Sequence, residues 1–280
     1  MCTRSWISLC SSCTSINRYS RDSRVTKYKK YTVSKKATDA DIRKGRLEGI
    51  HTLDMSLRNK ITNKAFTHLK RIHTLYINNC YDITDAAFVH LEGIHTLGMS
   101  YCTKITDAAF VHLEGIHTLD MSFCTKITDA ALVHLKGIHT LIINGCNYEE
   151  YFTGSTFEYL KGIHTLKMKY CYQIIKDSFV HLKGIHTLDM KDCSQITDEE
   201  FVHLKGIHTL KIRHMELITD AAFVHLEGIH TLDMCHCYHI TDAALVHLKG
   251  IHTLHIGGCH SITDEALKQL TRRSMDDDDD

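Results

Sequence analysis

This chain repeats a segment of 22 residues, and this repeat limits its possible folds more than any other feature. The tripeptide Ile-His-Thr occurs ten times, and successive copies are 22 residues apart in every case but one, where the spacing is 25. A fixed period in this range, with apolar residues at set offsets, is typical of a solenoid in which each repeat forms one coil. A single coil cannot bury two apolar faces alone, so neighbouring coils must stack into a continuous core. The ten repeats place their histidines at His51, His73, His95, His117, His139, His164, His186, His208, His230 and His252.

The first part of each repeat predicts a short strand. In residues 115–136, GIHTLDMSFCTKITDAALVHLK, the apolar Leu119 and Met121 alternate with polar residues. This alternation is typical of a strand with one buried face.

The second part of each repeat predicts a short helix. Thr128 or Asp129 can serve as its N-cap, and Leu132 and Leu135 follow at a helical spacing of three. Gly137 then stands just past the expected end, where helices often end in glycine.

The repeat pattern reads I-x-x-L-x-(M/I)-x-x-C-x-x-I-T-D-A-A-(F/L)-V-H-L-(E/K)-G. It resembles the cysteine-containing leucine-rich repeats known chiefly from F-box ubiquitin-ligase receptors, and its near-identical copies resemble repeat-expanded proteins of giant viruses. The resemblance covers residues 46–272 and implies an α/β leucine-rich-repeat solenoid. Such a solenoid is a curved horseshoe, with a parallel β-sheet on its concave side and short helices on its convex side. The resemblance also implies a protein-protein interaction module, with substrate recognition in ubiquitin-dependent degradation as the narrower role.

Three segments are expected along the chain. Residues 1–36 form a basic, disordered arm, residues 37–272 form the solenoid with a degenerate first repeat as its cap, and residues 273–280 form an acidic tail. The first 45 residues carry eleven Lys or Arg against three Asp or Glu. They have few leucines and no proline, whereas an F-box is rich in both. Residues 46–275 are nearly neutral, with 22 basic and 25 acidic residues. A neutral body argues against a dedicated nucleic-acid binder, and no apolar run is long enough to cross a membrane.

The sequence does not point to an enzyme. It has no Gly-rich phosphate loop, no nucleophile elbow and no metalloprotease spacing. Cys10 and Cys13 have redox-motif spacing but lack a strand–helix frame. We therefore expect a cytoplasmic binding protein without a cofactor. Eight cysteines share one offset and predict a ladder of buried thiols, namely Cys80, Cys102, Cys124, Cys146, Cys171, Cys193, Cys237 and Cys259.

Histidines at one offset form a line along a solenoid and not a converging set of metal ligands. Rings stacked along that line would repel one another when protonated, so we expect lowered pKa values in the Ile-His-Thr positions. A second line, near the helix ends, contains His68, His90, His112, His134, His181, His203, His225 and His247.

Specificity should lie where otherwise identical repeats differ. On the expected concave face, such positions carry cations beside one tyrosine in the later repeats and aromatic residues in the earlier ones. They predict docking of a protein or of an acidic or phosphorylated peptide, and tolerated surface variation is the other interpretation. A nucleic-acid or anionic-surface binder that uses these lysines and the basic arm is the alternative function. The candidate partner-binding residues are Tyr76, Tyr101, Phe123, Lys167, Lys169, Tyr170, Lys191, Lys211 and Arg213.

Two further features stand out against the repeat. Residues 147–160 replace one corner with a longer segment, which could be a contact loop or a neutral insertion. A histidine-rich group near the C-terminus has the residue types of a transition-metal site, although the expected metal content is none. Its members are His214, Asp233, Cys235, His236 and His255.

Overall fold

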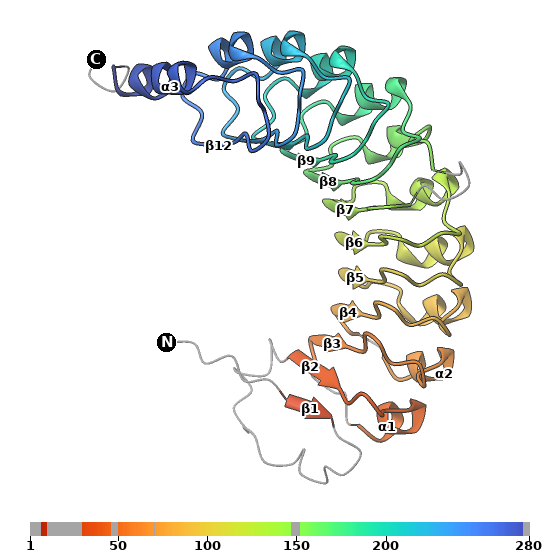
Figure 1. The fold of residues 1–280 in the computed structure, drawn as a ribbon. Coiled ribbons are helices and arrows are strands. Elements are labelled where there is room, and N and C mark those ends of the chain that lie inside the picture. Colours follow the sequence, from red (N-terminus) through yellow and green to blue (C-terminus); the bar gives the residue numbers. More distant parts are fainter. Residues whose placement is uncertain (1–6, 10–29, 46–49, 70, 147–151, 277–280) are drawn as a thin grey trace. The chain divides into compact units, whose positions relative to one another are not determined.

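The computed structural model describes residues 7–9, 30–45, 50–69, 71–146 and 152–276. The chain divides into two compact units, residues 1–138 and 139–280. In each unit the strands lie on the inner side of the curve and the short helices on the outer side (Figure 1). We call these two sides the strand face and the helix face. The expected solenoid is confirmed, because one strand and one short helix alternate along each unit.

The strands of the first unit pair in parallel and in register. Thr96 is the Cα partner of both Thr74 and Thr118, so residues at one repeat offset stand side by side. The strands are β1 (Ile7–Leu9), β2 (Lys30–Val33), β3 (Thr52–Asp54), β4 (Thr74–Tyr76), β5 (Thr96–Gly98) and β6 (Thr118–Asp120). The helices are α1 (Asp39–Lys44), α2 (Asn63–Phe66), and the 3₁₀ helices η3 (Asp85–His90), η4 (Asp107–Leu113) and η5 (Asp129–Leu135).

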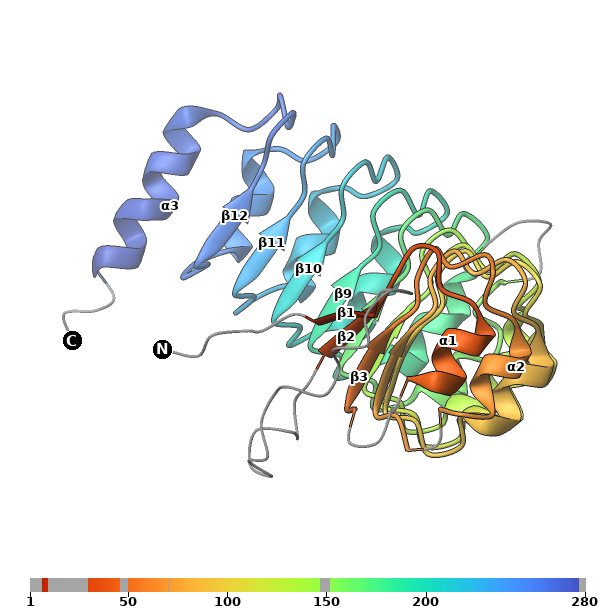
Figure 2. The ribbon, with the colours of Figure 1, turned by 90° about the horizontal axis from the view of Figure 1, so that it is seen from below.

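The second unit repeats this plan and ends in a longer helix. Figure 2 shows strands β9 to β12 in sequence order, with α3 after the last of them. The strands are β7 (Thr140–Ile142), β8 (Thr165–Lys167), β9 (Thr187–Asp189), β10 (Thr209–Lys211), β11 (Thr231–Asp233) and β12 (Thr253–His255). The helices are η7 (Phe157–Leu160), η8 (Lys176–Leu182), η9 (Asp198–Leu204), η10 (Asp220–His225), η11 (Asp242–His247) and α3 (Asp264–Asp276).

The core of each coil is built from the residues that the pattern marks as apolar. Leu119 and Met121 from the strand and Leu132 from the helix are each 0% exposed. Most helices are 3₁₀, and this suits the spacing of three between Leu132 and Leu135, because residues three apart share one face of a 3₁₀ helix. Burying one leucine side chain stabilises a fold by about 1.5–3 kcal/mol, so the stacked coils hold the solenoid together.

The cysteine ladder is confirmed as a line of buried thiols, and it also links the coils. The Cys124 thiol donates to the carbonyl oxygen of Met99, 3.1 Å away, and the Cys193 thiol donates to that of Met168 at 3.0 Å. Burial raises the pKa of Cys193 to about 12, so the thiol keeps its proton. At the same offset Arg58 donates from Nε to the carbonyl oxygen of Val33 at 2.8 Å. All nine cysteines in the described residues are free.

The Ile-Thr-Asp triplet forms a second link between coils. Asp107 accepts hydrogen bonds from the backbone N–H of Thr128 at 2.8 Å and from its hydroxyl at 2.6 Å. The Thr128 hydroxyl oxygen in turn accepts from the N–H of Ala130. Threonine is therefore the N-cap of its own helix, and the aspartate holds the cap of the next coil.

The stack extends beyond the expected solenoid at both ends. Strand β2 lies within the segment expected to be an arm and pairs with β3, Lys30 opposite Thr52. At the other end α3 continues to Asp276, inside the expected acidic tail. Disorder of the rest of the arm stays a prediction, because residues 1–6 and 10–29 lie outside the described residues, as do 147–151 of the insertion and the last four residues.

Candidate functional site

Two lines of variable side chains cross the strand face of the second unit. The first occupies the last residue of each strand, and its members are Cα partners across the sheet. The second lies two residues further along each repeat. We call the first the alternating row (Lys167, Asp189, Lys211, Asp233) and the second the cationic row (Lys169, Lys191, Arg213).

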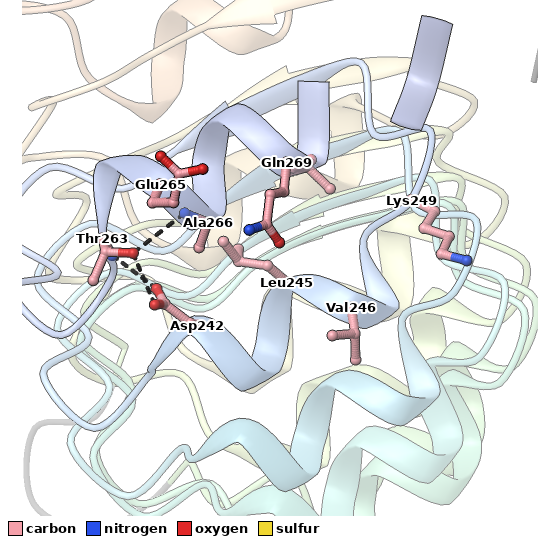
Figure 3. Close-up of a pocket in the computed structure, with 9 residues that line it drawn as sticks. Asp242, Leu245, Val246, Lys249, Thr263, Glu265, Ala266 and Gln269 are labelled. Carbon is pink, nitrogen blue, oxygen red and sulfur yellow. Dashed lines mark hydrogen bonds between the residues drawn. The ribbon is translucent and has the colours of Figure 1, made fainter. Parts of the chain in front are cut away.

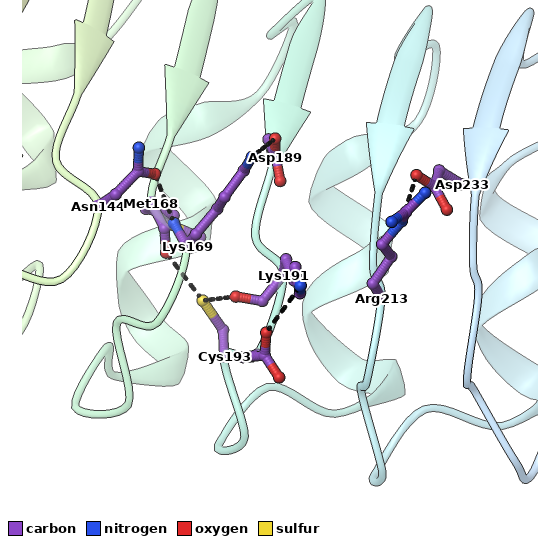
Figure 4. A network of polar contacts seen from close by, with 9 residues as sticks. Asn144, Met168, Lys169, Asp189, Lys191, Cys193, Arg213 and Asp233 are labelled. Atoms are coloured by element: carbon purple, nitrogen blue, oxygen red, sulfur yellow. Dashed lines mark hydrogen bonds and ion pairs between the residues drawn. The ribbon is translucent and has the colours of Figure 1, made fainter.

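Two cations of the cationic row are paired with buried carboxylates of the alternating row. Lys169 Nζ lies 3.1 Å from Asp189 Oδ2, and Arg213 Nε donates to Asp233 Oδ2 at 2.6 Å (Figure 4). Each cation reaches forward to the next strand of the sheet. The aspartates are almost fully buried, at 3% and 4% exposure, whereas both cations are partly exposed. The carboxylates therefore lie beneath the charges that they hold.

The pairing shifts the pKa of both Asp233 and Arg213. Burial by itself would raise the pKa of Asp233, but hydrogen bonds from the Cys235 thiol and Arg213, together with the guanidinium charge, outweigh it and lower the pKa. The hydrogen bond to Asp233 correspondingly raises the pKa of Arg213. Both groups stay charged at neutral pH.

The remaining cations have a more distant carboxylate partner or none among the described residues. Lys191 Nζ is 3.8 Å from Asp192 Oδ2 and 5.6 Å from the centre of the Tyr170 ring, which is within the range of a cation–π contact. Lys167 and Lys211 have no ion-pair partner in the part of the chain that the structure describes. The structure thus brings Tyr170 and the five predicted cations together on one face.

The predicted aromatic residues lie in the first unit and form a separate surface. Tyr76 lies against strand β5 at Gly98, where a Cβ would stand 2.7 Å from the tyrosine Cδ1. The rings of Tyr101 and Phe123 are stacked, with centroids 4.5 Å apart and an interplanar angle of 10°. Glycine at position 98 therefore makes room for Tyr76, and the other two rings stabilise each other.

Tyr101 and Phe123 were expected among the variable positions of the concave strand face, but they do not lie on strands. They stand in the turn after the strand, with φ values of 61° and 58° in the left-handed region. Sequence reasoning missed this turn, although Gly145 and Gly258 at the same offset signalled it, since glycine adopts positive φ most readily.

The candidate metal residues do not converge. Asp233 is held by Arg213 and Cys235, while the rings of His214 and His236 stack face to face with centroids 4.5 Å apart. Within the described residues, no group of three His, Cys, Asp or Glu side chains could hold a metal ion.

Within each unit, the Ile-His-Thr histidines stack on their neighbours along the sheet. Their ring centroids are 4.1 to 4.5 Å apart, and each Nδ1 lies 3.0 to 3.3 Å from the hydroxyl of the following threonine. Desolvation and then the neighbouring ring lower the pKa of His73 and His95, and the same causes act on His186 and His230. The predicted direction of the shift is confirmed for these four residues.

A pocket of about 210 Å³ lies on the helix face between η11 and α3 (Figure 3). Asp242 forms one wall and accepts hydrogen bonds from the backbone N–H and hydroxyl of Thr263, while Leu245 and Leu270 contribute apolar surface. This is the same Asp–Thr link that joins other coils, so the pocket reflects how α3 caps the stack.

None of the helices in the described residues combines the length and apolar character needed to span a membrane.

No family model matches the chain, and no curated protein is significantly similar to it in sequence. Solved structures do share its fold. The yeast Rad7–Elc1 complex matches with a TM-score of 0.52 at 15% identity, over 77% of this chain and 71% of the other. An internalin from Listeria monocytogenes matches with a TM-score of 0.61 at 17% identity, over 86% of this chain and 76% of the other.

A third match is the TLR13–ssRNA13 complex, with a TM-score of 0.62 at 14% identity over 83% of this chain. This chain covers only 36% of that larger one. The fold is a leucine-rich-repeat solenoid. At these identities the likeness establishes the fold alone, and fold does not determine the partner.

Proposed function

We propose that this leucine-rich-repeat solenoid is a non-enzymatic module that binds a protein partner, through an acidic segment, on the strand face of its second unit. The observation that carries the proposal is that the negative charges on this face are buried and the positive charges paired with them are more exposed. Asp189 and Asp233 are buried beneath Lys169 and Arg213, so an approaching partner meets cations first. The pairing also fixes two long side chains before binding, which reduces the entropy lost in the complex.

A narrower form of the proposal is a cytoplasmic substrate-recognition adaptor in ubiquitin-dependent degradation. The cysteine-containing repeat pattern supports it, and Rad7, a protein of similar fold, is found in complex with another protein, Elc1. In this form the strand face would hold the substrate, and another surface would contact the ligase.

The test is the binding of a fluorescent polyglutamate peptide by anisotropy. Reversing Lys167, Lys191 and Lys211 to Glu should weaken binding at least about tenfold, since each cation loses its attraction and gains a repulsion. The control variant reverses three exposed lysines of the same unit that follow its helices, Lys161, Lys183 and Lys205. Equal affinity of the two variants would contradict the proposal.

A nucleic-acid ligand is the second candidate, because the TLR13 solenoid was solved with ssRNA and the cationic row lies beside Tyr170. The predicted contribution of the basic arm lies largely outside the described residues. Two results would favour this candidate. Oligouridine would bind with an affinity that falls steeply as salt rises, and it would bind more tightly than polyglutamate at every salt concentration.

A further inference from the structure

Two positive groups are held by aspartates on strands β9 and β11, and a third belongs to strand β10 between them. Lys169 and Arg213 each reach one strand forward, so their charged ends lie beside Asp189 on β9 and Asp233 on β11. Lys211 belongs to β10 and is the Cα partner of both aspartates. Neighbouring strands are about 4.8 Å apart, so the three groups span roughly 10 Å. We call Lys169, Lys211 and Arg213 the cation triad.

The cation triad keeps hydrogen-bond donors available for a ligand. Among the described residues, Arg213 has a hydrogen-bond partner at Nε alone, and its side chain is 42% exposed. Its two terminal nitrogens can therefore face outward, and a guanidinium edge matches two oxygens of a phosphate or carboxylate. Lys211 adds an ammonium group that no described carboxylate pairs.

The acidic groups nearby are already engaged or set back. Asp189 and Asp233 lie below Lys169 and Arg213, and their side chains are only 5% and 6% exposed. Asp192 lies in the following turn beside Lys191. A ligand group at the triad therefore meets three cations, and the carboxylates of Asp189 and Asp233 are much less exposed than Lys169 and Arg213.

We propose that the cation triad binds a phosphorylated side chain of the partner protein, with Lys211 and Arg213 contacting the phosphoryl oxygens. This inference rests on the proposed function and names the chemistry that the site recognises. A phosphoryl group carries about −1.5 to −2 charges and three strong acceptor oxygens. A carboxylate carries a single charge and two oxygens, so a phosphoryl group is the better ligand for three cations. Asp189 and Asp233 act as positioning residues, because they hold Lys169 and Arg213 in place without touching the ligand.

A phosphorylated side chain fits the site better than a nucleic-acid strand. Strand binding without sequence preference uses aromatic faces on which bases stack. The aromatic rings described beside the cationic row already have partners: the Lys191 ammonium lies over the Tyr170 ring, and the His214 ring stacks on that of His236. The short span of the triad suits a single dianionic group.

The experiment uses three peptides that are identical and uncharged except at one central position, which is phosphoserine, glutamate or serine. Affinity for the full-length chain is measured by calorimetry, and the NMR signal of the Arg213 Nε–H is followed during each titration. We expect phosphoserine to bind at least about tenfold more tightly than glutamate, to shift the Arg213 signal, and to lose about tenfold in affinity in Lys211→Ala.

Two further variants separate ligand contact from folding. Lys205→Ala, an exposed lysine after η9, should bind the phosphopeptide as the unchanged chain does. Asp233→Asn should weaken phosphopeptide binding several-fold while the far-ultraviolet circular dichroism is unchanged. Equal binding of phosphoserine and glutamate would overturn the phosphoryl assignment and leave the proposed function standing. Failure of every anionic peptide, polyglutamate included, would overturn both, and tighter binding of oligouridine would replace them with a nucleic-acid ligand.

Discussion

At the scale of residues, the site depends in part on Asp233, which the sequence placed among candidate metal ligands and not beside the cations. Asp233 looked like a metal ligand beside His255 and Cys235, because residue types alone suggest coordination. Its partner is instead Arg213, which lies two residues after the end of the preceding strand, β10. That diagonal contact depends on the direction of two side chains, and repeat spacing does not specify this direction.

Replacing Asp233 with Asn should destabilise the fold. The change leaves Arg213 without its charged acceptor, and a hydrogen bond to a charged group contributes about 1.5–3 kcal/mol. Because the Asp233 pKa is lowered in the folded state, its contribution is present above the unfolded pKa of about 4 and is lost as pH falls through the folded value. Urea unfolding at pH 7 and pH 3 should show a large difference between the two proteins only at pH 7. A similar difference at both pH values would contradict the account.

Gly98→Ala should displace Tyr76. The new methyl group would stand 2.7 Å from the ring, so we expect a loss of about 1–3 kcal/mol in the free energy of unfolding or a shifted ring. A crystal structure of the variant and urea unfolding check this, and Gly98→Ala combined with Tyr76→Ala should recover much of the stability. An undisturbed Tyr76 at full stability would show that the contact is not tight.

At the scale of elements, the sequence predicted the strand and the helix of each repeat but not how one coil holds the next. Leu132 and Leu135 allowed either an α-helix or a 3₁₀ helix, since a spacing of three fits both. The turn that carries Tyr101 and Phe123 was missed, because most repeats place a residue other than glycine at its left-handed position. The hydrogen bonds between Asp107 and Thr128 became visible only when the coils were stacked.

Asp107→Ala should lower the free energy of unfolding by about 1–3 kcal/mol, because the Thr128 cap loses its acceptor. Asp107→Asn is the matched control, since the chain itself uses Asn63 to hold Thr84 at the equivalent position. We expect the asparagine variant to keep most of the stability in denaturant unfolding. Unchanged stability of Asp107→Ala would mean that the link contributes little.

At the scale of the whole molecule, the 22-residue period determined the fold in advance. Repetition turned each offset into a line of side chains, so the buried cysteines and the stacked histidines could both be predicted. Partner choice could not be predicted in the same way, because it depends on the few positions where repeats differ, such as Lys211 and Arg213.

The histidine stacks should make the protein sensitive to mild acid. The pKa values of His73, His95, His186 and His230 are lowered in the folded state, so the unfolded chain binds more protons at these residues. Their contribution to stability is present above the unfolded pKa of about 6.5 and falls as pH drops below it. The Tm should therefore decrease between pH 7.5 and 5.5. Replacing His186 and His230 with Asn should flatten this decrease. A Tm that does not change over this range would contradict the expected effect of the lowered pKa values.

Co-purification from a eukaryotic cytoplasm tests whether the strand face of the second unit recognises a partner protein. Three versions of the chain are used as bait in parallel. These are the unchanged chain, the variant with Lys167, Lys191 and Lys211 reversed to Glu, and the control with Lys161, Lys183 and Lys205 reversed. We predict that a defined protein is retained by the unchanged chain and the control, lost by the first variant, and released by phosphatase treatment. If both variants capture the same proteins as the unchanged chain, the strand face of the second unit is not the recognition surface.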